Sequence, residues 1–434
     1  MVRADKLLSY QSSLRLNRSL VCTILFIFSL FGYCVSSLAE NEAIGIVFII
    51  MQVLFFSFAS FDDELYCLFL YIPFYSYVLI SGTQLFNILM IIFTFKKMLL
   101  SKFRISTLLL PLAILLVELI QMLITNVDVG LSLFKLVLSI FVSVLILDEK
   151  KHINIEKASL FFIIGIAFSS LYVLYTSWGI ILDPSSRGGI AGMGNLNQNT
   201  FALYCSVAYA LGIIMSFSSK NKYLFIVLSI ICFIGGALTI SKAFFITAVF
   251  FLLLMLIKMN NIKFIFLSII IGAVIFVLFA KVPFLNSVIT SMINRFDTAT
   301  NVNDLTTGRL YLYTYYLDIL RDNPLTLLFG RGLLEYQAFY PLGSRTHNIV
   351  LEAVMGWGIC GFLIIISFYA SKAKKRMKSN GTKIQYSNLI PFMAFLFFSM
   401  SLSVLVENVT WFIIALCVLV ISDNTSVGGR KNAQ

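Results

Sequence analysis

The stretch from Ala158 to Ile181, ASLFFIIGIAFSSLYVLYTSWGII, contains no charged residue. An α-helix needs about 20 consecutive apolar residues to cross the hydrocarbon core of a bilayer, so this stretch predicts a transmembrane helix. Similar runs recur along the chain of 434 residues, which is 59% hydrophobic and only 12% charged. The composition therefore predicts an all-α polytopic membrane protein and excludes an ordinary soluble domain.

We predict about 14 transmembrane helices from the apolar runs. They cover residues 19–38, 43–60, 65–81, 83–95, 105–124, 129–147, 158–181, 198–217, 223–240, 242–257, 263–280, 347–370, 387–404 and 408–422. Together they would form a single integral membrane domain over residues 1–434, with one large loop, containing short helices, at residues 281–346. The first span ends near SSLAE, which is compatible with signal-peptide cleavage, although we expect the span to be retained.

The net charge is +12, and the basic residues lie mainly in the connections between the predicted spans. Most cations fall in alternate connections: Arg3 to Arg18, Lys96 to Arg104, Lys150 to Lys157, Lys220 and Lys222, Lys258 and Lys263, Lys372 to Lys383, and Arg430 with Lys431. The positive-inside rule then places both termini in the cytoplasm and the 281–346 loop on the outer, periplasmic face. This accounts for the basic balance without nucleic acid as a partner. One inner turn, ASFDDELY at residues 59–66, has no cation of its own.

The large loop contains NDLTTGRLYLYTYYLDILRDNPLTLLFGRG at residues 303–332. Leu310, Tyr313, Leu317 and Leu320 repeat at helical spacing, which predicts a surface helix that begins near Thr306. The helix should stop at Asn323, because the proline that follows disfavours helical backbone at the residue before it. Arg309 would then lie in the first turn, where free N–H groups and the helix dipole favour an anion.

Eight cations fall on the predicted outer face: Arg187, Lys242, Lys281, Arg295, Arg309, Arg321, Arg331 and Arg345. An outer face normally has few cations, although a loop of this length also carries balancing acids. We interpret Arg295 and Arg321 as such loop residues. Arg187 and Arg309 lie beside glycines, which permit close approach of the backbone to a ligand. An arginine fork fits a diphosphate, so these two are candidate anion ligands.

His347 is the one predicted outer-face imidazole in a chain with two histidines. It is either an interfacial side chain at a helix entrance or a candidate acid or base. Glu40 and Glu42 are the other candidate outer bases, and His152 is predicted to be solvated on the inner face. The seven cysteines lie in apolar runs without CxxC spacing, so we expect no metal site and no disulfide framework. We interpret FDDE at residues 61–64 as a solvated turn.

Three charges fall within predicted spans. Glu118 and Lys135 lie at similar distances from the outer turn that joins their two spans, so we hypothesise that they form an ion pair. Glu352 lies five residues after His347, which is about 140° around a helix. It is therefore not expected to orient that imidazole.

Four segments resemble the O-antigen ligase and O-antigen polymerase superfamily of polytopic membrane proteins. THNIVLEAVMGWGICGFLII matches the His-Asn, Leu and Gly-x-x-Gly pattern at His347, Asn348, Leu351, Gly358 and Gly361. TTGRLYLY and DNPLTLLFGRG are similar to the Gly-Arg, Asn-Pro and Gly-x-Gly succession at Arg309, Asn323, Pro324, Gly330 and Gly332. SRGGIAGMGNLNQNTFA resembles an arginine loop at Arg187. TISKAFF resembles a Thr-x-Ser-Arg segment in which Lys242 replaces the arginine.

The resemblance implies a glycosyltransferase that needs no metal or other cofactor. It would invert the configuration at the anomeric carbon of the sugar that it transfers. Its donor would be an oligosaccharide on undecaprenyl diphosphate, presented at the outer face of the bacterial inner membrane. Arg187 and Arg309, assisted by Lys242 and Arg331, would bind the diphosphate. His347 and Arg309 would be catalytic, with the imidazole accepting the acceptor's proton or only hydrogen-bonding its hydroxyl.

Two activities within the superfamily stay open. A polymerase joins lipid-linked repeat units, with a chain-length regulator as an optional partner, and a ligase moves a finished chain onto lipid A core. We favour the polymerase for the Phe- and Ile-rich composition. A transporter of lipid-linked oligosaccharides is a third alternative, but polar residues here gather on one face and in one loop rather than at the midplane of both halves.

Overall fold

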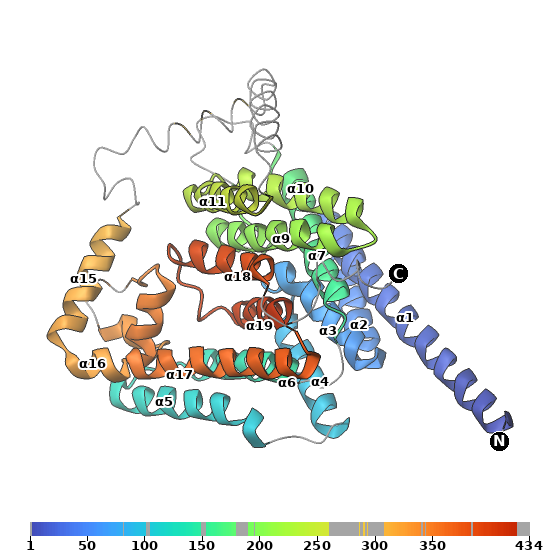
Figure 1. Cartoon of the computed structure of the whole chain (residues 1–434), viewed down its shortest axis with the longest axis horizontal. Helices are drawn as coiled ribbons and strands as arrows, with labels where there is room; N and C mark the ends of the chain where they lie inside the picture. The colour runs from blue at the N-terminus through green and yellow to red at the C-terminus, as the bar shows by residue number, and fades with distance from the viewer. Residues whose placement is uncertain are drawn as a thin grey trace.

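The computed structural model describes residues 2–80, 82–100, 105–148, 153–178, 190–194, 196–259, 308–339, 344–382 and 385–422, with residues 286, 290, 293 and 342 as isolated positions. Within these ranges the protein is almost entirely helical, and the one sheet is a two-stranded hairpin. Most of the helices run roughly side by side along one direction, as Figure 1 shows. The predicted all-α class is confirmed for this part of the chain.

The helices before the large loop are α1 (Val2–Leu38), α2 (Glu42–Phe58), α3 (Phe61–Tyr71), α4 (Leu85–Leu100), α5 (Leu109–Thr125), α6 (Gly130–Asp148), α7 (Ile155–Thr176), α9 (Gln198–Ser218), α10 (Lys222–Leu238) and α11 (Lys242–Met259). Those after it are α17 (Ile349–Asn380), α18 (Tyr386–Ser399) and α19 (Asn408–Ser422). Helix α17 contains a break, because Gly358 has a non-helical backbone with φ 68°.

Five described helices are long and apolar enough to cross a membrane: Arg18–Leu38 of α1, α6, α7, α9 and α17. The shorter apolar helices are α2, α5, α10, α18, α19 and residues Lys242–Phe251 of α11. These elements support a multi-pass membrane protein and coincide with eleven of the predicted spans. The spans 65–81 and 83–95 correspond to α3 and α4, which are not among these elements, and 263–280 lies outside the described residues. The number of crossings and their orientation stay predictions.

The predicted span 65–81 is wrong as a continuous helix. Helix α3 ends at Tyr71 and is followed by a 3-10 turn, η1 (Ile72–Phe74), and by the hairpin strands β1 (Leu79–Ile80) and β2 (Thr83–Gln84). Pro73 lacks a backbone N–H and cannot continue an α-helix, and Gly82 has a positive φ of 80° in the hairpin turn. The apolar composition of the segment predicted that it is buried, but not that the helix ends within it.

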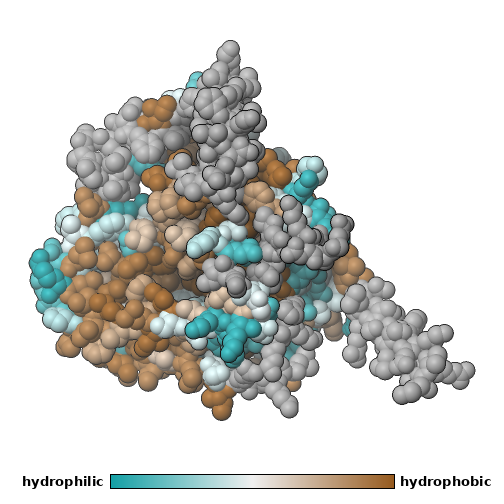
Figure 2. Space-filling view, viewed as in Figure 1, coloured by the Kyte–Doolittle hydropathy of each residue, from teal (hydrophilic) through white to brown (hydrophobic). Residues whose placement is uncertain are grey.

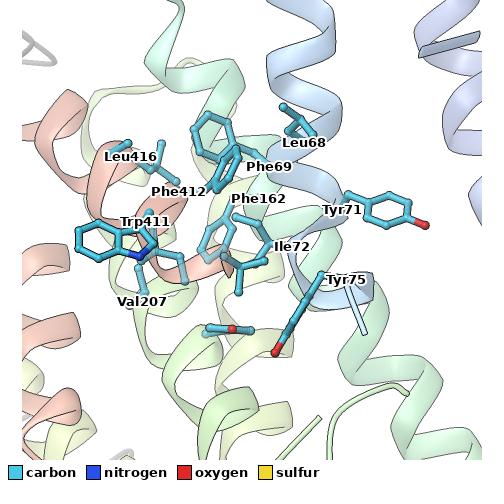
Figure 3. Close-up of a cluster of buried hydrophobic side chains, with 14 of the residues drawn as sticks. Leu68, Phe69, Tyr71, Ile72, Tyr75, Phe162, Val207, Trp411, Phe412 and Leu416 are labelled. Carbon is cyan, nitrogen blue, oxygen red and sulfur yellow. The ribbon is translucent and has the colours of Figure 1, made fainter. Parts of the chain in front are cut away.

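The core lies where α3, α7, α9 and α19 meet. Figure 3 shows Phe69, Phe162, Val207 and Phe412 facing one another from these four helices, and all four are fully buried. The outer surface of the bundle, by contrast, exposes many large apolar side chains, such as Leu116 at 60%. Figure 2 shows this broad apolar face, with hydrophilic residues at the edge where α15 (Arg309–Asp322) lies. Such a surface suits contact with lipid.

Acidic and basic side chains pair at the end of the bundle away from α15. Lys96 pairs with Glu64 at 2.6 Å, and Lys157 pairs with Asp63 at 2.7 Å. The acidic segment that has no cation of its own is therefore neutralised by lysines from two other connections. Lys372 likewise pairs with Asp148 at 2.5 Å. Each pair joins segments that the charge pattern had assigned to the same side. The predicted FDDE turn is therefore paired and partly buried rather than simply solvated.

Candidate functional site

Helix α15 lies across the end of the bundle near the start of α17, followed by the short helix α16 (Pro324–Phe329), as Figure 1 shows. Its C-cap is Asn323, so the predicted stop is confirmed, and its first residue is Arg309. Its buried residues are Tyr316 and Leu320, whereas Leu317 is 52% exposed. The predicted apolar face is thus wrong in part. The Tyr316 hydroxyl donates to the Ser344 carbonyl, which turns this face towards the loop before α17.

Arg309 and His347 are brought together through Tyr313. Arg309 and Tyr313 are four residues apart and therefore share one face of α15. The Tyr313 hydroxyl donates to the carbonyls of His347 at 2.9 Å and Met400 at 2.8 Å. One side chain thus ties the start of α15 to the segment before α17 and to the segment after α18. The described geometry joins two residues that sequence motifs alone had paired.

The backbone of His347 is held in an unusual conformation. Its φ is 49°, a left-handed value that costs a non-glycine residue about 1 kcal/mol or more. Its N–H donates to Ser403 Oγ at 2.9 Å, and the adjacent Asn348 side chain caps α17 by accepting from Val350 N and Leu351 N. The imidazole Nδ1 is buried without a hydrogen-bond partner among the described residues. Strain together with an unsatisfied polar atom is typical of a functional position.

The electrostatic surroundings keep the imidazole neutral. Burial lowers the pKa of His347 below its usual 6.5, and the positive charges of Arg309 and Arg345 lower it further. Burial also lowers the pKa of Arg309, and a guanidinium in a protein stays protonated. The result is one neutral imidazole facing two permanent cations. This arrangement can accept a proton at the imidazole and attract a polyanion at the guanidinium groups.

Arg345 is the site residue that sequence reasoning missed. Its Nη1 lies 3.8 Å from Oε1 of Glu352, and that glutamate is fully buried. The other carboxylate oxygen of Glu352 accepts from Val404 N at 2.8 Å and Leu405 N at 3.1 Å. Glu352 therefore fixes the loop that carries Ser403 and does not contact the imidazole, in accord with its predicted angular offset. A signal for Arg345 existed, since it lies two residues before His347.

Gly330 and Gly358 of the quoted motifs have a common structural reason: two backbones pack directly against each other. Arg331 N and Gly332 N donate to the carbonyls of Met355 at 2.7 Å and Gly356 at 2.8 Å, just before the break in α17. A Cβ on Gly330 would lie 2.2 Å from the Gly356 carbonyl oxygen, and one on Gly358 would lie 2.1 Å from that of Leu328. Only glycine permits this approach.

The Glu118–Lys135 pairing hypothesis is wrong. The Glu118 carboxylate accepts from Leu333 N at 2.9 Å, from Leu334 N at 3.4 Å and from Trp357 Nε1 at 2.5 Å. It is therefore satisfied by neutral donors from α17 and from the segment docked on α17. Glu335 lies beside Glu118, and burial together with the nearby Glu118 carboxylate raises the pKa of Glu335. Depth along two neighbouring helices predicted proximity but could not predict a partner from a distant loop.

The other predicted ligands are arranged differently. Arg331 turns its Nε to Thr326 Oγ1 at 3.0 Å, back onto α16. Lys242 begins α11, directly after a loop that Ser241 fastens to Asn199 at 3.0 Å. Arg187 lies outside the described residues, although Ile190 N bonds to the Leu238 carbonyl at 3.0 Å. The charges that act on His347 are those of Arg309 and Arg345.

Among the described residues no group of three or more His, Cys, Asp or Glu side chains could hold a metal ion. All seven cysteines are free thiols.

Residues 223–366 match the family model described as O-Antigen ligase. The match covers Lys242, Arg309, Arg331 and His347, and confirms the resemblance to the O-antigen ligase and polymerase superfamily over these residues. It does not distinguish between the two activities. No curated protein matches the chain, and no solved structure does.

Replacing Gly358 should test the packing of the two backbones. Gly358→Ala forces a Cβ against the Leu328 carbonyl at a position with φ 68°, so we expect a loss of several kcal/mol and undocking of α16. Gly381→Ala is the matched control, because Gly381 has φ 63° but open space around it, and should cost only about 1 kcal/mol. Thermal unfolding in detergent would compare them. Equal stability of the two variants would contradict the close contact.

Proposed function

We propose that this protein is a glycosyltransferase of the membrane that uses a glycan on undecaprenyl diphosphate as donor, and specifically an O-antigen polymerase. The observation that carries the proposal is the neutral imidazole of His347 held beside Arg309 and Arg345 at one end of an apolar bundle. The family match supports the class of enzyme. The membrane bundle supports a donor that is anchored in lipid.

The reaction needs little from the protein beyond positioning and charge. The acceptor's hydroxyl oxygen attacks the anomeric carbon from the side opposite the diphosphate, and the bond from that carbon to the diphosphate oxygen breaks. The electron pair leaves with the lipid diphosphate, and the configuration inverts. Arg309 would stabilise the charge that develops on the leaving group, with Arg187, Lys242 and Arg331 as further proposed diphosphate ligands.

His347 would receive the proton of the acceptor hydroxyl. A base must be unprotonated at the working pH, and the lowered pKa of this imidazole meets that condition at neutral pH. The His347 N–H donates to Ser403 and the His347 carbonyl accepts from Tyr313. These two hydrogen bonds fix the backbone of His347 and leave its ring nitrogens unused. Orientation of the hydroxyl by a hydrogen bond alone is the simpler form of the same role.

The proposal places the site on the periplasmic side of the inner membrane, with both termini in the cytoplasm. The donor would be a lipid-linked oligosaccharide, and a chain-length regulator would be the protein partner of a polymerase. No metal and no nucleic acid enter the scheme.

Deletion of the gene in its host separates the activities of the superfamily. For a polymerase we expect single repeat units on the lipid anchor and on the core, with the polysaccharide ladder lost from a gel. Long chains stranded on undecaprenyl diphosphate, with none on the core, would instead identify a ligase. Accumulation of lipid-linked units on the cytoplasmic face would contradict both and identify a transporter.

Two arginines of α15 provide a matched test of the site. Arg309→Ala should lower glycan transfer by about 100-fold or more, because a half-buried cation beside the leaving group is removed. Arg321→Ala should leave transfer unchanged, since Arg321 is 71% exposed and pairs only with its helix neighbours Asp318 and Asp322. Transfer would be measured on membranes with equal amounts of each variant. Equal activity of both variants would remove Arg309 from the mechanism.

The pH profile tests His347 as a base. Because its pKa lies below 6.5, activity should persist through mildly acidic pH and fall only as the pH drops through that lowered value. Arg345→Gln removes one of the charges that lower it, so the acidic limb should move to higher pH by up to about one unit. Arg345→Lys keeps the charge and should leave the limb in place. An acidic limb that is identical in all three proteins would contradict the assignment.

A further inference from the structure

An apolar groove of about 530 Å³ lies between α17 and α18, with α19 behind it. Its walls are Ile349, Val350, Ala353, Trp357, Phe362, Ile365, Ile366, Tyr369, Ala370 and Ala373 of α17, Leu389, Phe392, Phe395 and Leu396 of α18, Met400 and Leu405 of the following loop, and Trp411, Ile414, Val418 and Ile421 of α19. The groove is therefore formed by three helices of the bundle and contains no charged side chain.

The groove runs from the candidate site to the opposite end of the bundle. Its lining begins at Ile349, two residues after His347, and includes Met400, whose carbonyl accepts from Tyr313. It ends at Ala373, next to Lys372, which pairs with Asp148. At about 1.5 Å per helical residue, the part of α17 from Ile359, after the break, to Ala373 alone spans roughly 20 Å, and the residues before the break continue the groove towards the candidate site.

The aromatic residues of the groove turn their polar atoms away from it. Trp357 Nε1 donates to Glu118 at 2.5 Å, and Trp411 Nε1 donates to the Leu405 carbonyl at 3.1 Å. The Tyr369 hydroxyl is bonded to Ser143 at 2.6 Å. What these side chains present to the groove is ring carbon. The walls are thus hydrocarbon along the whole length, although they contain two indoles and a phenol.

We propose that this groove holds the polyprenyl chain of the donor lipid, an inference that rests on the proposed function. A lipid diphosphate bound at Arg309 and His347 must direct its tail into the apolar region, and the groove opens beside these residues. Its depth suits a chain of many isoprene units. Each isoprene unit of the lipid that packs into this groove makes closer contacts than it makes in detergent or bilayer, and so adds to the affinity. Binding should therefore become tighter as the polyprenyl chain becomes longer.

The test compares two tryptophan variants of α17. Ala370 lines the deep half of the groove, roughly 18 Å along α17 beyond the break at Gly358, so Ala370→Trp should obstruct it there. Ile364 is 58% exposed on the same helix and lies outside the groove, so Ile364→Trp is the control. Binding of undecaprenyl diphosphate and farnesyl diphosphate to purified protein in detergent would be measured, because the short farnesyl chain does not extend to Ala370.

We expect Ala370→Trp to weaken binding of undecaprenyl diphosphate by at least about tenfold while leaving binding of farnesyl diphosphate unchanged. Ile364→Trp should bind both as the wild-type protein does. The proposal is overturned if Ala370→Trp binds the long chain normally, if both variants lose it equally, or if the phospholipid dioleoyl phosphatidate displaces undecaprenyl diphosphate at similar concentrations.

A transfer assay on the same wild-type protein separates this proposal from the function. Selective loss of long-chain binding in Ala370→Trp, in a protein that transfers no glycan to any acceptor, would support the groove and contradict the enzyme. Transfer that Ala370→Trp leaves unchanged at limiting undecaprenyl-linked donor would contradict the groove and leave the enzyme in place.

Discussion

The end of the molecule where α15 lies depends on the contact between two backbones at the break in α17. The carbonyls of Met355 and Gly356 accept N–H groups from the segment that follows α16, and a side chain at Gly330 or Gly358 would prevent it. This contact holds α16 on the bundle, and with it α15 and Arg309. Glu118 reinforces it from α5 by accepting from the same segment. The helix break is therefore the point from which the candidate site is positioned.

The two ends of the protein differ in how their charged side chains are paired. Lys96, Lys157 and Lys372 each have a carboxylate within 2.7 Å, so these three cations of the end away from α15 are individually neutralised. At the other end Arg321 pairs with Asp318 and Asp322 on the surface of α15, whereas Arg345, near His347, has Glu352 at the longer distance of 3.8 Å. That end keeps an excess of positive charge beside His347. An anionic ligand would find its countercharge there already in place.

Much of the helical framework could be predicted from the sequence, because long apolar runs require burial or lipid and allow few other structures. The end of α15 could also be predicted, from Pro324. The partners of Glu118 could not, since they belong to a segment that is distant in the chain. The end of α3 before Pro73 had a local signal, which the apolar composition of the run concealed. For the site, the motifs identified Arg309 and His347. Arg345 was missed because its role depends on the fold that turns its charge towards the imidazole.

The groove beside α17 is open along its side as well as at its end, because Ile366 in its wall is 48% exposed. A hydrophobic chain can thus enter and leave sideways, within the plane of the bilayer, without passing through water. Occupancy is then set by the mole fraction of that lipid in the membrane rather than by a concentration in solution. A lipid that has reacted at one end keeps the same tail, so product and substrate would exchange by lateral diffusion and compete on equal terms for a single channel.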